Sequence, residues 1–291
     1  MDRTKIGREA ARRAIRLREQ LGLNPEQPID AITAAENLGI KVTLCAQTTV
    51  EGLYARTNPP CIITSAHRPV GRIAFSVGHE LGHHVYEHPG VSMHEFAEES
   101  VPFTEKPIPE LEADYFAGHF LMPNRGVRAA LSAHGWELAK LTPEQVFRLA
   151  SFFGVSYAAL LSHLRYNLTM IDDSIYTRLS KLEPKDVKSA LLGFKHTRDL
   201  IVIDNLWGPR DIDLRTTDYA MVAGDCKLEG VCAKTEGTVG QWTIVKAIRQ
   251  GEGTIRGPNG TTKIRVSGKL NGDYFTGHSR NRFEEDPDDG I

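Results

Sequence analysis

The stretch between Pro69 and Pro89 constrains this chain more than any other part of its sequence. A proline at each end predicts a helix of about 18 residues, because proline interrupts a helix but fits its first turn. Apolar residues recur at helical spacing along it, at Ile73, Val77, Leu81 and Val85. This stripe predicts that one face packs on the core, which leaves the face of His79 and His83 for a cleft.

The sequence His79-Glu80-Leu81-Gly82-His83 lies in the middle of this predicted helix. Histidines four residues apart lie one turn apart on the same face, so both imidazoles can bind one zinc ion. Glu80 is rotated by one residue, so its carboxylate reaches a metal-bound water and not the metal. Zinc lowers the pKa of that water to about 7, and Glu80 takes its proton. The pattern therefore predicts metal-dependent hydrolysis of a peptide bond, with Glu80 as the catalytic base.

The same helix carries a second pair of histidines four residues apart, His84 and His88. This pair has no glutamate after its first histidine, and His88 stands at the helix end before Pro89. We therefore interpret both as surface residues or as residues that support the ligands. The alternative to a metal site is a helix with incidental surface histidines.

A catalytic zinc ion takes three protein ligands and keeps one position open, so a third ligand is expected from another segment. Residues 109–117 read as the start of a second helix, with Glu110 and Asp114 on one face. We expect Glu110 to bind the metal and Asp114 to hold the outer nitrogen of a ligand histidine. Glu112 is the less favoured ligand, because it points about 200° away from Glu110 and both cannot bind. The alternative role for either glutamate is a carboxylate favoured by the helix dipole.

These motifs together resemble the ImmA/IrrE family of metallopeptidases. The resemblance rests on the segment around Pro28–Val42, on the HELGHH run at 79–84, and on the segment from Glu110 to Pro123, and it covers residues 5–170. It implies a small zincin-like fold in which His79, His83 and Glu110 bind zinc and Glu80 is the general base. Members of the family include phage anti-repressors and the radiation-response protease of deinococci, which cleave helix-turn-helix repressors. The resemblance thus implies a repressor protein as the substrate.

Residues 150–156 have the pattern of the turn in a helix-turn-helix, with Gly154 followed by a helix-capping Ser156. A helix that reads DNA bases needs exposed Arg, Lys, Asn or Gln. The second helix here offers Ser162, His163 and Arg165 and is otherwise apolar. We therefore favour a structural or repressor-docking role for this segment, and DNA binding is the disfavoured alternative.

Composition excludes several classes of protein. The chain has 291 residues and 41% hydrophobic residues, with 35 basic and 37 acidic side chains, so its net charge of -2 gives no overall attraction to nucleic acid or membrane. No run reaches the roughly 18 apolar residues of a membrane helix, and the first residues have no apolar core of a secretory signal. Four cysteines in this length are not a disulfide framework. We expect a cytoplasmic protein with no membrane partner.

The pattern along the chain predicts an α+β protein with three parts. Residues 1–124 are the expected zincin-like metallopeptidase domain, with strands at 40–45, 52–56 and 61–66. Residues 125–172 are a helical, helix-turn-helix-like segment. Residues 173–291 are a separate β-rich domain, predicted as a sandwich or barrel, that ends in an acidic tail at 283–291 expected to be disordered.

The function predicted from the sequence is that of a zinc-dependent endopeptidase, gluzincin-like, that cleaves a helix-turn-helix transcriptional repressor. Manganese is an alternative to zinc, because a His/His/Glu site accepts several divalent metals. Two other functions are alternatives: a DNA-binding regulator with a structural metal, and a protein that sequesters a repressor without cleaving it.

Overall fold

The computed structural model describes residues 3–45, 48–88, 92–95, 106–208, 210–267, 269–270 and 273–274. The chain is a mixture of helix and sheet, with a mainly helical region followed by a separate sheet-rich region. It divides into two compact units, residues 1–141 with 153–178 and residues 142–152 with 179–291. The helical segment 125–172 therefore contributes to both units. The acidic tail lies outside the described residues.

The first unit combines a four-stranded sheet with helices. The sheet has the order β1-β3-β2-β4, in which β1 and β3 are parallel and the other neighbours are antiparallel. The bounds of its strands are β1 (Lys41–Cys45), β2 (Val50–Ala55), β3 (Cys61–Ser65) and β4 (Ser92–Glu95). The helices of this unit are α1 (Arg3–Gln20), α2 (Ala31–Glu36), α3 (Val70–Tyr86), α4 (Ile108–Leu121), α5 (Asn124–His134), η2 (Leu138–Lys140), α7 (Tyr157–Ser162), η3 (His163–Asn167) and α8 (Asp173–Ser180).

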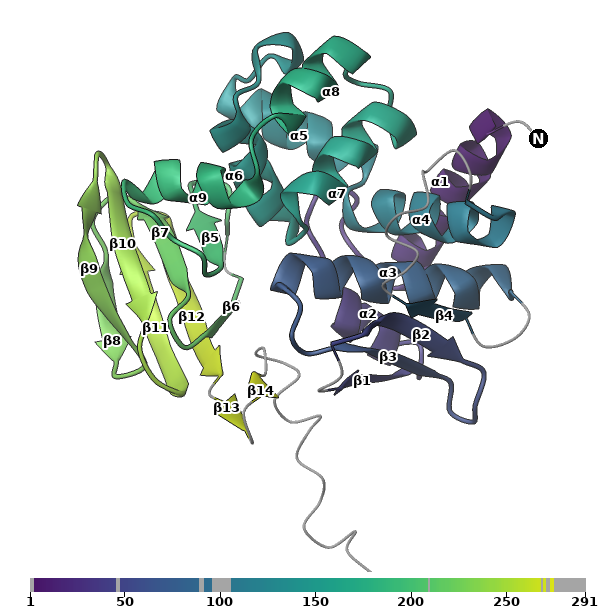
Figure 1. Cartoon of the computed structure of the whole chain (residues 1–291), viewed down its shortest axis with the longest axis horizontal. Coiled ribbons are helices and arrows are strands. Elements are labelled where there is room, and N and C mark those ends of the chain that lie inside the picture. Colours follow the sequence, from purple (N-terminus) through teal and green to yellow (C-terminus); the bar gives the residue numbers. More distant parts are fainter. Residues whose placement is uncertain are drawn as a thin grey trace, which may run out of the picture. The chain divides into compact units, whose positions relative to one another are not determined.

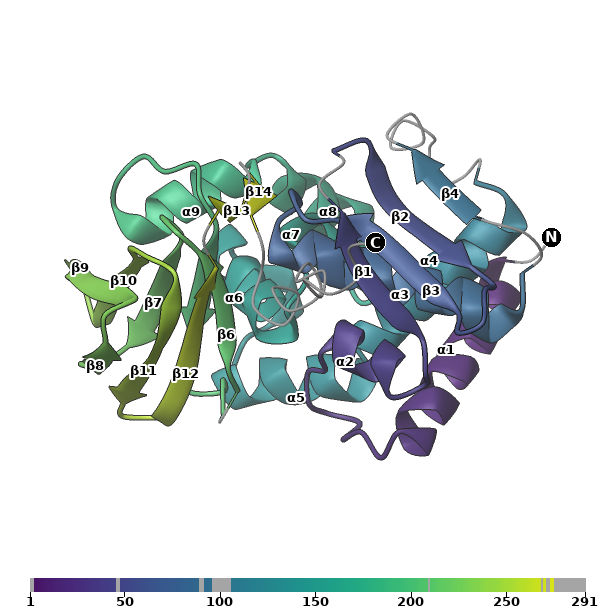
Figure 2. The same ribbon diagram turned by 90° about the horizontal axis from the view of Figure 1, so that it is seen from below.

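Helix α3 lies across the sheet, and α4 packs beside α3 with α1 behind it (Figures 1 and 2). The predicted apolar stripe of α3 is buried at Ile73, Val77 and Leu81, as expected of the face that meets the sheet. The opposite face, which carries His79 and His83, is covered by α4, and both histidines are buried. The structure therefore places a second helix of the same chain over the face at which a cleft was expected.

The helix-turn-helix pattern forms the predicted local structure. Thr142 and Gln145 cap α6 (Pro143–Phe153) reciprocally, since each side chain accepts the backbone N–H of the other residue. Gly154 has a φ of +66°, the left-handed conformation that ends the helix, and the Ser156 hydroxyl accepts the Ala159 N–H to begin α7. The turn itself packs against α3, where the backbone of Val155 would lie 2.5 Å from any Cβ added to Gly71.

The second unit is a β-sandwich with two helices. Two four-stranded sheets have the orders β5-β7-β10-β9 and β6-β12-β11-β8, and apolar residues from both sheets form one buried core. The strands are β5 (Leu200–Ile203), β6 (Ile212–Arg215), β7 (Tyr219–Ala223), β8 (Lys227–Gly230), β9 (Ala233–Val239), β10 (Trp242–Ala247), β11 (Gly251–Gly257) and β12 (Gly260–Ser267), with a short pair β13 (Lys269–Leu270) and β14 (Asp273–Tyr274). The helices are α6 and α9 (Pro184–Leu192).

A buried carboxylate in this second unit makes its stability depend on pH. Asp218 is 4% exposed, and burial, together with the charge of Asp199, raises its pKa to about 6 against the hydrogen bond from the Arg215 N–H. A carboxyl group whose pKa is raised by folding stabilises the fold when protonated. Its contribution is therefore present below pH 4 and is lost as the pH rises through 6.

We expect Asp218→Asn to remove this pH dependence, which amounts to about 3 kcal/mol for a shift of about two pKa units. The measurement is urea unfolding of the full chain between pH 4 and pH 7 in a Trp136→Phe background, in which Trp207 and Trp242 report on the second unit. An unchanged slope of unfolding free energy against pH in the Asn variant would contradict the assignment to Asp218.

Across the described part of the chain, no single helix is long and apolar enough to cross a membrane, although the bent pair formed by α6 and residues 157–167 meets the length and composition test when taken together.

Candidate metal centre

The site begins with a close approach of two helices. Gly82 in α3 lies against α4, and a Cβ at this position would come 2.9 Å from the Ala113 Cα. Gly78, one turn earlier, faces Ala117 and Leu121 of the same helix. Glycine weakens a helix by its flexibility. At Gly82 the close approach of the α4 backbone explains why it is tolerated, whereas at Gly78 an added methyl group would press only on the flexible Leu121 side chain. The two small residues therefore lie where a second helix approaches α3.

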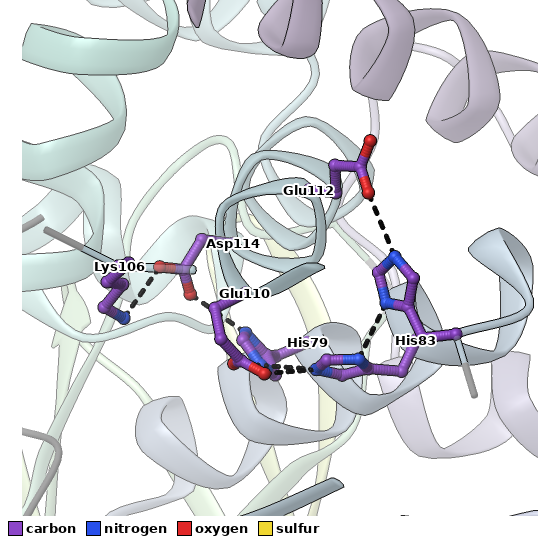
Figure 3. Close-up of polar contacts among 7 residues, drawn as sticks. His79, His83, Lys106, Glu110, Glu112 and Asp114 are labelled. Carbon is purple, nitrogen blue, oxygen red and sulfur yellow. Dashed lines mark hydrogen bonds and ion pairs between the residues drawn. The ribbon is translucent and has the colours of Figure 1, made fainter. Parts of the chain in front are cut away.

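Helix α4 begins at Ile108, with Pro109 in its first turn as predicted, and this start places Glu110 beside α3. The His79 Nε2 lies 3.1 Å from the His83 Nε2 and 3.1 Å from a Glu110 carboxylate oxygen. The other Glu110 oxygen lies 3.5 Å from the His83 Nε2. Figure 3 shows the three side chains converging from the two helices. Among the described residues, they are the one cluster of His, Cys, Asp or Glu with a metal-binding arrangement.

The donor set fits a divalent cation in spacing and in chemistry. Bonds of 2.0–2.1 Å from a tetrahedral zinc ion place two donor atoms about 3.3 Å apart, close to the separations observed. A carboxylate only accepts hydrogen bonds, and a neutral imidazole whose outer nitrogen carries the proton also presents a lone pair. Three such groups repel one another unless a cation or a proton lies between them. Nitrogen and oxygen donors of this kind suit zinc and manganese.

Asp114 supports His79 from behind. Its carboxylate lies 2.9 Å from the His79 Nδ1, the nitrogen that faces away from Glu110. The second oxygen of Asp114 accepts a hydrogen bond of 2.8 Å from the Lys106 ammonium group (Figure 3). Because a carboxylate accepts only, His79 carries its proton on Nδ1 and turns the Nε2 lone pair toward the site. This is the position that the sequence assigned to Asp114, and Lys106 is an addition to it.

His83 is supported by a different pair. The His83 Nδ1 lies 2.8 Å from the His88 Nδ1, and the His88 Nε2 lies 3.0 Å from a Glu112 oxygen. Glu112 therefore faces away from the cluster and contacts it through His88, whereas Glu110 reaches both ligand imidazoles. His84 takes no part in this chain, since its Nδ1 lies 2.6 Å from the Tyr54 hydroxyl.

The surroundings of the cluster shift the pKa values of His79 and His83 in opposite directions. Burial lowers the pKa of His79, but the carboxylates of Asp114 and Glu110 outweigh burial and raise it to about 10. Burial lowers the pKa of His83 to about 4, against the opposing effect of Glu110. Both imidazoles cannot be protonated together at neutral pH. At neutral pH the uncomplexed His79 therefore carries a proton on each nitrogen while His83 is neutral, so a cation binds by displacing the Nε2 proton of His79, and Asp114 keeps the proton on Nδ1.

Glu80 lies beside the cluster and is fully buried under strand β2. The strand can approach because residue 52 is glycine: a Cβ there would overlap the Glu80 Oε1 and lie 3.1 Å from the Glu80 Cδ. Gly52 thus leaves space for the Glu80 carboxylate between α3 and the sheet. This contact could not be predicted from local sequence patterns, because it joins residues far apart in the chain.

We expect Gly52→Ala to lower kcat for the peptide cleavage proposed below about 100-fold, as expected for a displacement of Glu80, the proposed base, by about 1 Å. Metal affinity should stay unchanged, because Glu80 contributes no donor atom to the cluster. The measurements are steady-state kinetics and metal titration. Gly257→Ala is the matched control, since a Cβ at this strand glycine meets no atom closer than 3.6 Å. Equal kcat values for the two variants would contradict the role of Gly52.

Three tyrosines are candidates for a hydrogen-bond donor to the reacting carbonyl oxygen. Tyr54 is buried, and its hydroxyl contacts His84. The Tyr86 ring stacks on His88, and the Arg13 guanidinium lies over the Tyr86 ring, 4.3 Å from its centroid. Tyr115 is buried beside Gly7 of α1. All three rings pack against other residues of the first unit.

The comparisons with known proteins agree with this geometry. Residues 35–165 match the model of the peptidase M78 family, described as the IrrE N-terminal-like domain. Residues 35–165 belong to the IrrE N-terminal-like family. The resemblance to ImmA/IrrE metallopeptidases is thereby confirmed for this part of the chain, and the IrrE N-terminal-like domain contains α3, α4 and all three residues of the metal cluster.

Other comparisons add less. A search of curated proteins finds no sequence that matches the chain. Among solved structures, a Mycobacterium tuberculosis transcriptional regulator has 16% sequence identity and a TM-score of 0.35. That similarity covers 56% of this chain and 52% of the regulator, and it is too weak to bear on fold or function. The assignment to a metal-dependent peptidase family rests on the IrrE N-terminal-like domain.

Proposed function

We propose that this protein is a zinc-dependent endopeptidase of the gluzincin type, with His79, His83 and Glu110 as metal ligands and Glu80 as the general base. The observation that carries the proposal is the convergence of three donor groups from α3 and α4, with contacts of 3.1–3.5 Å between them, and with Glu80 on the same helix as the two histidines. The small sheet beside α3 supports a zincin-like fold for this unit.

A divalent cation bound by these residues would polarise the scissile carbonyl and increase the acidity of water beside it. Glu80 then accepts a proton from the attacking water and delivers it to the amine that leaves. Asp114 and Lys106 hold His79 in the orientation that this reaction needs. Glu110 is the most exposed of the three proposed ligands, with 18% of its side chain exposed against 6% for His79 and 2% for His83.

We further propose a helix-turn-helix transcriptional repressor as the substrate. The support is membership of the IrrE N-terminal-like family together with the resemblance to anti-repressor peptidases. A direct DNA-binding function has less support. His163, one of the polar residues of the helix after the turn, is buried on the Met122 carbonyl, and Arg165 pairs with Asp173. His163 is therefore not available to read a base edge, and Arg165 would have to leave its ion pair with Asp173 to do so.

The proposal is tested by incubating the purified full chain with repressors encoded by neighbouring genes, with added zinc in one arm and a chelator in the other. We expect a single internal cut in the repressor in the zinc arm and none in the chelator arm, read by intact-mass spectrometry. An intact repressor in both arms, from protein that binds one equivalent of metal, would reject the peptidase function and favour sequestration of the repressor.

A further inference from the structure

The contact of His83 with His88 and Glu112 has a consequence for metal binding. His88 lies outside α3, just after Glu87, whose φ of +57° turns the chain back at the helix end. The turn is closed by the N–H groups of Glu87 and His88, which donate to the His84 and His83 carbonyls. A left-handed backbone is unusual for glutamate, and here it brings the His88 ring to a centroid distance of 4.9 Å from the His83 ring.

The hydrogen bonds run in one direction through this chain of groups. The Glu112 carboxylate only accepts, so the His88 Nε2, 3.0 Å away, must carry a proton. A neutral His88 then has a bare Nδ1, which accepts the hydrogen bond donated by the His83 Nδ1–H. A neutral His83 with its proton on Nδ1 has a lone pair on Nε2. That is the nitrogen that faces His79 and Glu110.

The opposite order of donors and acceptors, in which neutral His88 donates to His83, is excluded by the Glu112 carboxylate. A proton on the His88 Nδ1 would leave the His88 Nε2 lone pair against the Glu112 oxygens. It would also place the His83 proton on Nε2, where it blocks a cation. Glu112 thus selects the tautomer of His83 indirectly, through His88, which lies between them in the hydrogen-bond chain. Asp114 selects the tautomer of His79 by direct contact.

We propose that His88 and Glu112 are positioning residues that lock His83 in the tautomer able to bind the metal. The pair is held in place from both sides: the His88 ring stacks on Tyr86 at a centroid distance of 5.4 Å, and Glu112 is fixed on α4 two residues after Glu110. The inference rests on the metal site of the proposed function and not on its peptidase activity.

The test measures the affinity of the full-length protein for cobalt(II), in competition with a chromophoric chelator. We expect Glu112→Leu and His88→Phe each to weaken cobalt binding about 10- to 100-fold, the range for residues that orient metal ligands. The double variant should bind cobalt no more weakly than the weaker-binding of the two single variants, because the two residues act in one chain of hydrogen bonds. Glu112→Gln should retain most of the affinity, since its amide oxygen can still accept the His88 proton.

Glu87→Gln is the matched control, because it removes one negative charge next to His88 without touching the chain of hydrogen bonds. Urea unfolding in the presence of the chelator checks that each variant folds. If His88→Phe does not fold, the cobalt affinity of Glu112→Leu alone tests the proposal. A second readout is the long-range 15N–1H NMR spectrum of the histidines, in which wild-type His83 should be protonated on Nδ1.

Cobalt affinities of Glu112→Leu and His88→Phe equal to that of Glu87→Gln would overturn the proposal, as would a His83 protonated on Nε2. The result is independent of catalysis. A protein whose cobalt affinity depends on His88 and Glu112 but that cleaves no repressor would refute the proposed function alone. A protein that cleaves the repressor but binds cobalt equally well without His88 and Glu112 would refute this inference alone.

Discussion

Glu80→Gln is expected to lower kcat for the proposed repressor cleavage by about 100- to 10,000-fold, the usual contribution of a general base, the role proposed for Glu80. Glutamine has the size of glutamate, so it should fit under Gly52 without displacing β2, but its amide cannot take a proton from water. Metal affinity should stay at the wild-type value, because the donor atoms belong to His79, His83 and Glu110. The measurements are single-turnover cleavage and metal titration on the same preparation.

The matched control for this variant is Glu137→Gln, which makes the same change at an exposed glutamate of the same unit. Its kcat should equal that of the wild type. A Glu80→Gln protein that cleaves the repressor within tenfold of the control, with full metal occupancy, would show that another group accepts the proton.

Arg18→Met is expected to destabilise the first unit by about 3 kcal/mol or more, because it leaves buried carbonyl groups without their hydrogen-bond donor. Arg18 is 3% exposed and donates to the carbonyls of Phe120 and Gln27 at 2.6 Å, and to that of Asn24. Burial lowers its pKa to about 10, and the guanidinium remains charged at neutral pH. The Phe120 carbonyl lies at the end of α4, where a cation is favoured by the helix dipole.

The measurement is urea unfolding followed by circular dichroism at the helix wavelength. Arg16→Met, at an exposed position of the same helix, is the control and should change stability by no more than about 0.5 kcal/mol. Equal unfolding midpoints for the two variants would contradict the account of Arg18. The effect matters for the site, because α1 packs on α4 and α4 carries Glu110.

The parts of the site that could be predicted from the sequence are those fixed by helix periodicity. His79 and His83 share a face because they are four residues apart, and Pro109 marks the start of the helix that carries Glu110 and Asp114. The strands at β1, β2 and β3 and the cap formed by Thr142 and Gln145 follow from equally local patterns.

The parts that could not be predicted depend on contacts between distant segments. The link from His83 through His88 to Glu112 requires a left-handed turn at Glu87, a conformation that sequence patterns assign to glycine or asparagine. Gly52 acquires its role only when β2 is placed over Glu80. In the sequence, Lys106 is recognisable only as a lysine that precedes a proline. Its contact with Asp114 forms through the packing of α4.

We propose that α3 and α4 together bind one divalent cation through His79, His83 and Glu110. The most direct test is zinc K-edge X-ray absorption of the zinc-loaded full chain. We predict a first shell of nitrogen and oxygen at about 2.0–2.1 Å, with the multiple-scattering signature of two imidazoles. A shell of sulfur at about 2.3 Å, from the free cysteines, or a spectrum unchanged by Glu110→Ala, would contradict the claim.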